Sequence, residues 1–129
     1  KNIIKPALKR KRIVICDRFI DSTIAYQVYG KKVSKPFIEG IHKFILQGVK
    51  PNITFVLKVS SKSSKLKLKK RKTKNRYDNF SQSFYTKAQN AFLKIARNKK
   101  NYFVLNSSLN NTDLEKKIFN IVCKYLKIK

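Results

Sequence analysis

The sequence contains few of the residues that mark a class of protein at first sight. Its 129 residues include no Trp, no Met, three Gly, three Pro, two Cys and one His. With His42 as its single histidine and two distant cysteines, the chain is not expected to build a zinc-type cluster. Cys16 and Cys123 each lie in an apolar segment, so we expect them to be reduced core thiols in a cytoplasmic protein.

Long apolar runs are also missing. No stretch of about 18 apolar residues occurs, so we expect neither a transmembrane helix nor a membrane partner. The N-terminal KNIIKPALKRKR lacks the apolar centre and the small-residue cleavage site of a secretory signal. With 42% hydrophobic residues, nine Phe and six Tyr, the chain is still able to bury a core, and its length predicts one domain over residues 1–129.

Acidic residues are scarce. The chain has 6 Asp and Glu against 32 Lys and Arg, which gives a formal net charge of +26. Such a charge suits nucleic acid. However, the preference for Lys together with many Ile and Asn is also what AT-biased coding places on any solvated surface. We therefore expect the chain to bind phosphate groups of some kind, and we do not expect nucleic acid as its main partner.

Short β-branched and aromatic runs alternate with helical patterns. Strands are expected at residues 12–16, 53–59 and 102–105, and about five helical patterns surround them. The first pattern covers residues 1–9. The second begins near Asp21, which we expect to cap it, and ends by Gly30. This alternation predicts an α/β fold with a parallel sheet.

The three later helical patterns have clearer boundaries and apolar faces. Ser34 and Pro36 indicate the start of a helix that runs to about Gln47, with Gly48 as its stop. An apolar stripe over residues 79–96 and another that begins at residue 111 or 112 predict two more amphipathic helices. Between the second strand and these helices, residues 62–76 hold nine cations and no acid.

The stretch VICDRFIDSTIAYQ, residues 14–27, concentrates the polar chemistry. Asp17 and Arg18 follow the expected first strand, and ligands of open α/β sheets bind beyond the carboxyl ends of strands. A carboxylate there suits the hydration shell of Mg²⁺, and a guanidinium suits a phosphate. The alternative is a strand-end Asp–Arg ion pair followed by an ordinary helix.

The whole chain resembles the rear portion of a bacterial thymidylate kinase (dTMP kinase). IIKPAL and VICDRFIDSTIAYQVYG match the family's run through its DR motif, and KPNITFVLKV resembles the following strand. KLKLKKRKTKNRYDNF resembles the lid, expected over residues 62–78, and FYTKAQNAFLKIA and YFVLNSS resemble the helix and strand after it. The resemblance implies a P-loop NTPase-type parallel sheet, MgATP and dTMP as partners, dTDP as product and a homodimer.

The resemblance also implies roles for individual residues. Asp17 corresponds to the acid on the Mg²⁺ side, acting through water, and Arg18 to the clamp on the monophosphate. Ser22 and Thr23 match positions that face thymine, Tyr26 the residue under the deoxyribose, and Gln27 a neighbouring polar contact. The cations expected over the ATP phosphates are Lys67, Lys69, Arg71 and Arg76, with Arg71 also catalytic. Asn106 and Ser107 match the loop that approaches the adenine.

Several features depart from the family's pattern. Lys58 stands where the family commonly has an acid, and Asn52, Asn75 and Asp78 replace its usual Asp, Asp and Glu. No G-x-x-x-x-G-K-[ST] occurs, so nothing in the chain would cradle a β-phosphate.

The missing P-loop and the missing initiator Met suggest a piece of a longer kinase. The chain would supply the third, fourth and fifth strands of a sheet whose first strand lies between the third and fourth. We then expect it to be a partial domain that is neither stable nor active alone. A basic nucleic-acid-binding module and another nucleoside monophosphate kinase are the alternatives.

Overall fold

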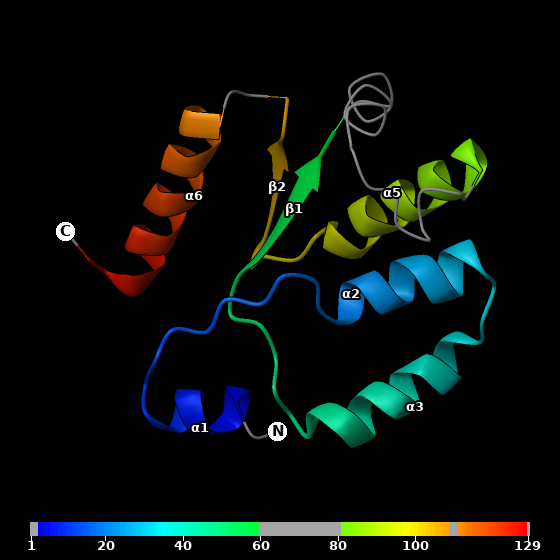
Figure 1. Ribbon diagram of the computed structural model, residues 1–129, viewed down its shortest axis with the longest axis horizontal. Coiled ribbons are helices and arrows are strands. Elements are labelled where there is room, and N and C mark those ends of the chain that lie inside the picture. Colours follow the sequence, from blue (N-terminus) through cyan, green and yellow to red (C-terminus); the bar gives the residue numbers. More distant parts are fainter. Residues whose placement is uncertain (1–2, 60–80, 109–110, 129) are drawn as a thin grey trace, which may run out of the picture.

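Two parallel strands with helices packed around them form the part of the chain that the structure describes (Figure 1). The structure is a computed structural model and describes residues 3–59, 81–108 and 111–128. The helices and strands follow in the order α1 (Ile4–Lys9), α2 (Ile20–Thr23), η1 (Ile24–Gly30), α3 (Lys35–Leu46), β1 (Thr54–Lys58), α5 (Gln82–Ala96), β2 (Tyr102–Asn106) and α6 (Asn111–Leu126). The expected α/β fold with a parallel sheet is confirmed.

The strands β1 and β2 pair directly in parallel, in a register that runs from Thr54 opposite Tyr102 to Lys58 opposite Asn106. Their sequences, TFVLK and YFVLN, are rich in the β-branched and aromatic residues that suit a pleated surface. The rings of Phe55 and Phe103 lie side by side with centroids 5.8 Å apart. The predictions at residues 53–59 and 102–105 are therefore confirmed.

The prediction of a strand at residues 12–16 is wrong. This segment has no regular secondary structure, and within the described residues β1 and β2 form the only ladder, so the sheet has two strands there instead of the three expected. Ile13 and Ile15 are 68% and 93% exposed. A strand exists only when a neighbouring strand pairs with its N–H and C=O groups, and a β-branched run does not provide that neighbour.

The helix that follows the Asp17–Arg18 turn changes its winding partway along. It begins as α2 with Phe19 at its N-cap and no side-chain cap, so the expected capping role of Asp21 is wrong. From Ile24 it continues as the π-helix η1, which ends at Gly30 as expected. The i→i+5 pattern extends past its end, where Lys31 N–H donates to the Tyr26 carbonyl at 3.0 Å.

Helix α3 has the predicted bounds, but most of its apolar face is exposed in the described structure. It starts after Ser34 with Pro36 in its first turn, and it ends at a left-handed pair, Gln47 (φ 48°) and Gly48 (φ 84°). Ile38 is buried, but the expected apolar face is open within the described residues, with exposed fractions of 61% for Phe37 and 81% for Phe44.

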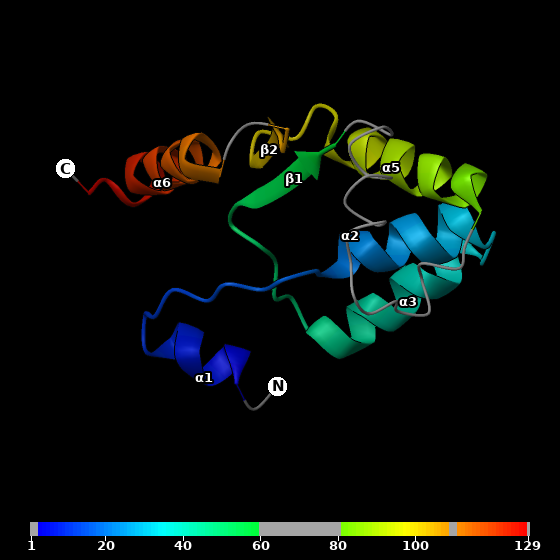
Figure 2. The ribbon, with the colours of Figure 1, turned by 45° about the horizontal axis from the view of Figure 1, so that its top comes forward.

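The core lies where η1 meets α5. Figure 2 shows α5, α2 and α3 stacked in layers, and η1 continues α2. Small side chains let the two backbones approach, and Phe84 fills the contact; the most buried apolar residues are Ala25, Ile38, Phe84, Ala88, Ala91 and Ala96. The predicted stripe of residues 79–96 is thus confirmed on α5 at Phe84, Ala88 and Ala91.

Helix α6 lies on the other side of the strand pair from α5 (Figures 1 and 2). It was predicted from residue 111 or 112, and it begins at Asn111. Over the described residues, no helix has both the length and the apolar character needed to cross a membrane.

The contact at Gly30 gives a stability test. A Cβ at position 30 would lie 2.5 Å from Phe84 Cε2 and 3.0 Å from its Cζ, while a Cβ on Gly40 would meet nothing within 4 Å. Because Phe84 is buried, we expect Gly30→Ala to lower the free energy of unfolding by about 1–3 kcal/mol. Gly40→Ala, inside α3, should raise it by up to about 1 kcal/mol. Urea denaturation measures both, and equal stability of the two variants would contradict the packing described.

Candidate active site

The site begins at the turn formed by Asp17 and Arg18. Both side chains are exposed, and Arg18 has a left-handed backbone with φ 68°. The Cys16 thiol donates a hydrogen bond to the Arg18 carbonyl at 3.3 Å, which closes the turn. Five other non-glycine residues of the described chain share this conformation, so it marks a turn and does not by itself mark a site.

Arg18 and Tyr26 lie together. The Arg18 guanidinium carbon is 5.5 Å from the centroid of the Tyr26 ring, within cation–π range. The Tyr26 ring is itself held by α5: its centroid lies 5.9 Å from that of Phe84 and 6.0 Å, edge on, from that of Phe92. An exposed guanidinium and an aromatic ring are therefore adjacent, which is the pair of groups that the sequence predicts for a monophosphate and its sugar.

The other expected nucleoside contacts lie on the same helix. Ser22 and Thr23 are half-buried on α2, and Gln27 is half-buried on η1. The Gln27 carbonyl accepts a hydrogen bond from Val33 N–H at 2.9 Å, which ties η1 to the segment after it. The structure thus places Ser22, Thr23, Tyr26 and Gln27 on one continuous helix behind Arg18, and π-helical winding of this kind is frequent at functional sites.

Asp21 joins this helix to the sheet. Its side chain is 7% exposed, and its Oδ2 accepts a hydrogen bond of 2.8 Å from the Tyr102 hydroxyl at the start of β2. Burial, together with the hydrogen bond and the charge of Asp21, raises the pKa of Tyr102 to about 12. Sequence reasoning missed Tyr102, since no local pattern relates two residues 81 positions apart.

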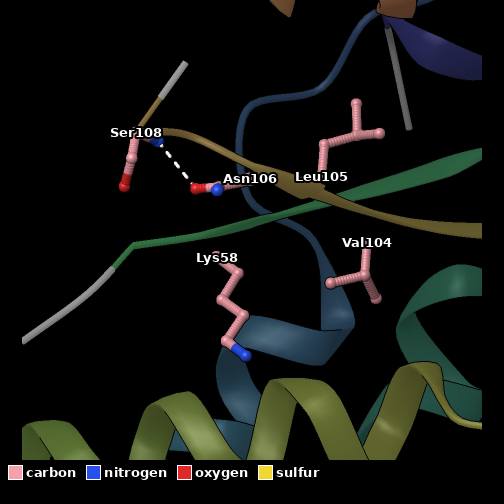
Figure 3. Close-up of a pocket in the computed structure, with 5 residues that line it drawn as sticks. All are labelled: Lys58, Val104, Leu105, Asn106 and Ser108. Atoms are coloured by element: carbon pink, nitrogen blue, oxygen red, sulfur yellow. Dashed lines mark hydrogen bonds between the residues drawn. The ribbon is translucent and has the colours of Figure 1, made fainter.

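Asn106 and Ser107 form a second group at the carboxyl ends of the strands. Ser107 donates to the Lys58 carbonyl from both its backbone N–H (2.8 Å) and its hydroxyl (3.2 Å). The Asn106 side-chain oxygen accepts from Ser108 N–H at 2.9 Å (Figure 3).

These residues border a hollow of about 340 Å³ that is lined by Lys58, Val104, Leu105, Asn106 and Ser108. Lys58 and Val104 lie on one side of the strands and Leu105 on the other (Figure 3). The carboxyl end of a parallel sheet is where α/β proteins bind ligands. Asn106 and Ser107 lie at this end of the strands, and their approach to adenine stays a prediction; the Ser107 hydroxyl is already engaged with the Lys58 carbonyl.

The expected lid falls outside the described residues. This applies to residues 62–78 and to Lys67, Lys69, Arg71 and Arg76 within them. The end of β1 that leads to this segment is anchored, because Gln89 of α5 donates to the Val59 carbonyl at 3.0 Å.

Asp17 is the residue for which the sequence predicts a part in Mg²⁺ binding. Among the described residues no three His, Cys, Asp or Glu side chains gather into a possible metal cluster. An exposed single carboxylate suits an outer role, in which it accepts a hydrogen bond from water in a Mg²⁺ shell. Asp17 is accessible for such a role, which stays a prediction, and the described residues around it offer no further carboxylates for a cage made by protein groups alone.

The parallel strands and the helices that flank them define an α/β protein. Its Asn106–Ser107 group lies at the carboxyl ends of the strands, where that class binds ligands, whereas the helix behind the Arg18 turn contacts the start of β2 through Asp21 and Tyr102. The chain belongs to the thymidylate kinase family, whose sequence pattern matches residues 1–118.

Individual relatives agree. A thymidylate kinase of Wolbachia sp. subsp. Brugia malayi is 44% identical over 98 residues, which are 76% of this chain and 46% of that protein. One from Ehrlichia ruminantium is 39% identical over 125 residues, 97% of this chain and 58% of the relative. The crystal structure of thymidylate kinase from Ehrlichia chaffeensis matches with a TM-score of 0.69 at 28% identity, covering 93% of this chain and 57% of that one. The chain thus spans about half the length of the curated relatives it matches.

The Tyr102 phenol gives a pH test. Its pKa is raised from 10.0 to about 12 in the folded protein, so between pH 10 and 12 the unfolded chain ionises while the folded chain keeps the proton. The contribution of the protonated Tyr102 phenol to the free energy of unfolding should be complete below pH 10, and it should decline as the pH rises to 12. Absorbance at 295 nm should show a late-titrating phenol that Tyr102→Phe removes, and the decline of stability should be smaller in that variant. Loss of an ordinary phenol titrating near pH 10 would contradict the buried bond.

Proposed function

We propose that these residues are the rear portion of a kinase that transfers the γ-phosphoryl group of ATP to dTMP. An oxygen of the dTMP phosphate attacks the γ-phosphorus, the bond to the β–γ bridging oxygen breaks, and dTDP and ADP leave. The observation that carries this proposal is the distance of 5.5 Å between the Arg18 guanidinium carbon and the centre of the Tyr26 ring. The helix that contains Tyr26 also carries Ser22, Thr23 and Gln27. Membership of the thymidylate kinase family supports the choice of nucleotide.

On the dTMP side, Arg18 anchors the accepting phosphate through its planar set of donors. Tyr26 lies beneath the deoxyribose, where its bulk disfavours a 2′-hydroxyl, and the polar groups of Ser22, Thr23 and Gln27 face the thymine. Phosphoryl transfer needs little covalent help from the protein, so these residues act by holding the acceptor in line and by stabilising charge.

On the ATP side, we assign the phosphates to Lys67, Lys69, Arg71 and Arg76, and the adenine to the loop at Asn106 and Ser107. Lys58 lines the strand-end hollow and adds a cation there. Mg²⁺ bound with ATP would neutralise phosphate charge, with Asp17 oriented toward a water of its shell. We further propose that the enzyme is cytoplasmic and acts as a homodimer, and that the P-loop lies in sequence outside these 129 residues.

The phosphate clamp is tested by Arg18→Ala in the full-length protein. Loss of this anchor should lower the turnover of dTMP by roughly 10²-fold or more, because the group that holds the accepting phosphate in line and offsets its charge is removed. The matched control is Arg97→Ala, which removes another exposed arginine, at the C-cap of α5. Steady-state kinetics with dTMP and ATP measure both, and wild-type turnover in Arg18→Ala would reject the assignment.

A further inference from the structure

One buried polar contact joins the helix of the site to the sheet. The Tyr102 hydroxyl donates to Asp21 Oδ2 at 2.8 Å, and Asp21 is 7% exposed, which makes it the one buried charged residue in the described part of the chain. A buried carboxylate without a partner is costly, so this bond strongly favours one placement of the helix against the strand.

Tyr102 is itself fixed within the sheet. Its backbone N–H donates to the Lys99 carbonyl at 3.1 Å, and Lys99 Nζ lies 4.5 Å from the centre of its ring. Across the ladder it is in register with Thr54. These contacts hold Tyr102 in the sheet. Its hydroxyl can therefore position the helix that carries Asp21.

Asp21 lies in the same helix as residues that we assign to dTMP, so its bond to Tyr102 affects where they lie. It directly precedes Ser22 and Thr23, and Tyr26 and Gln27 follow one turn later. A helix with side chains has a radius of about 5 Å, so a rotation of roughly 20° about its axis would move the side-chain tips by about 2 Å. Displacements of this size are enough to disturb a bound substrate's alignment.

We infer that Asp21 and Tyr102 form a positioning pair that sets the rotation of the α2–η1 helix, and with it the dTMP-contacting side chains, relative to the sheet. The inference rests on the proposed function. Neither residue is assigned a contact with substrate. Because β2 begins at Tyr102 and carries Asn106 at its other end, roughly 13 Å away along the strand, the same strand also relates this helix to the strand-end group.

The test uses Tyr102→Phe in the full-length protein, which removes one hydroxyl and keeps the ring. We expect KM for dTMP to rise about tenfold, on the scale of losing one hydrogen bond to a charged group, with KM for ATP changed less than threefold. Tyr125→Phe is the matched control, since it removes a hydroxyl from an exposed residue of α6. Asp21→Ala should reproduce the effect, and Asp21→Asn, which keeps an acceptor oxygen, should restore most of the affinity.

A double-mutant cycle separates positioning from mere stabilisation. If the pair acts through its bond, Asp21→Ala combined with Tyr102→Phe should raise KM for dTMP no further than either change alone. Additive effects, an equal rise in both KM values, or a lower melting temperature with unchanged kinetics would each overturn the inference. Failure of the unsubstituted protein to phosphorylate dTMP would instead count against the proposed function, and it is observed before any variant is made.

Discussion

The close approach of η1 to α5 is the contact on which the candidate site depends. Gly30 leaves room for the Phe84 ring, and Ala25, Ala88 and Ala91 keep the two helices near each other. The same contact supplies the aromatic neighbours of Tyr26, whose ring in turn lies beneath the Arg18 guanidinium. Packing between two helices thus determines where a surface cation stands, so the chemistry at the turn is supported from the core.

The net charge acts over longer distances than this packing does. A net charge of +26 attracts polyphosphates at long range but selects no particular one. Selection requires donors and surfaces at fixed positions, and the proposed function assigns that part to Asp17, Arg18 and the helix behind them. The few acids are informative for the same reason: of the two in this region, Asp17 is exposed, where a hydrated cation has access, and Asp21 is buried, where it bonds to Tyr102.

The features that the sequence predicted well are those set by local pattern. The apolar period of residues 79–96, the Gly48 stop after α3 and the β-branched runs of β1 and β2 all depend on neighbours within a few residues. The features it missed depend on distant partners. Residues 12–16 have the composition of a strand, but no strand pairs with them among the described residues. Asp21 is a residue type that often caps helices, but its side chain accepts a hydrogen bond from Tyr102, 81 positions away. The π-helical winding of η1 has no simple periodic signature, so an ordinary helix was expected there.

Several large apolar side chains are exposed in the described part of the chain. Ile15 and Phe44 are 93% and 81% exposed, and Leu57 and Val104 on the strands are 52% and 46% exposed. Soluble proteins seldom leave so much large apolar surface open, and such surface usually marks an interface. The curated relatives are about twice as long as the region they share with this chain. Residues 12–16 have no ladder partner among the described residues, and Ile13 and Ile15 within them are largely exposed, so this segment belongs to the uncovered surface. The Asp17–Arg18 turn follows this segment directly, and it is held by the Cys16 thiol on its N-terminal side and by the Tyr26 ring of η1, so it joins an uncovered segment to the packed helix.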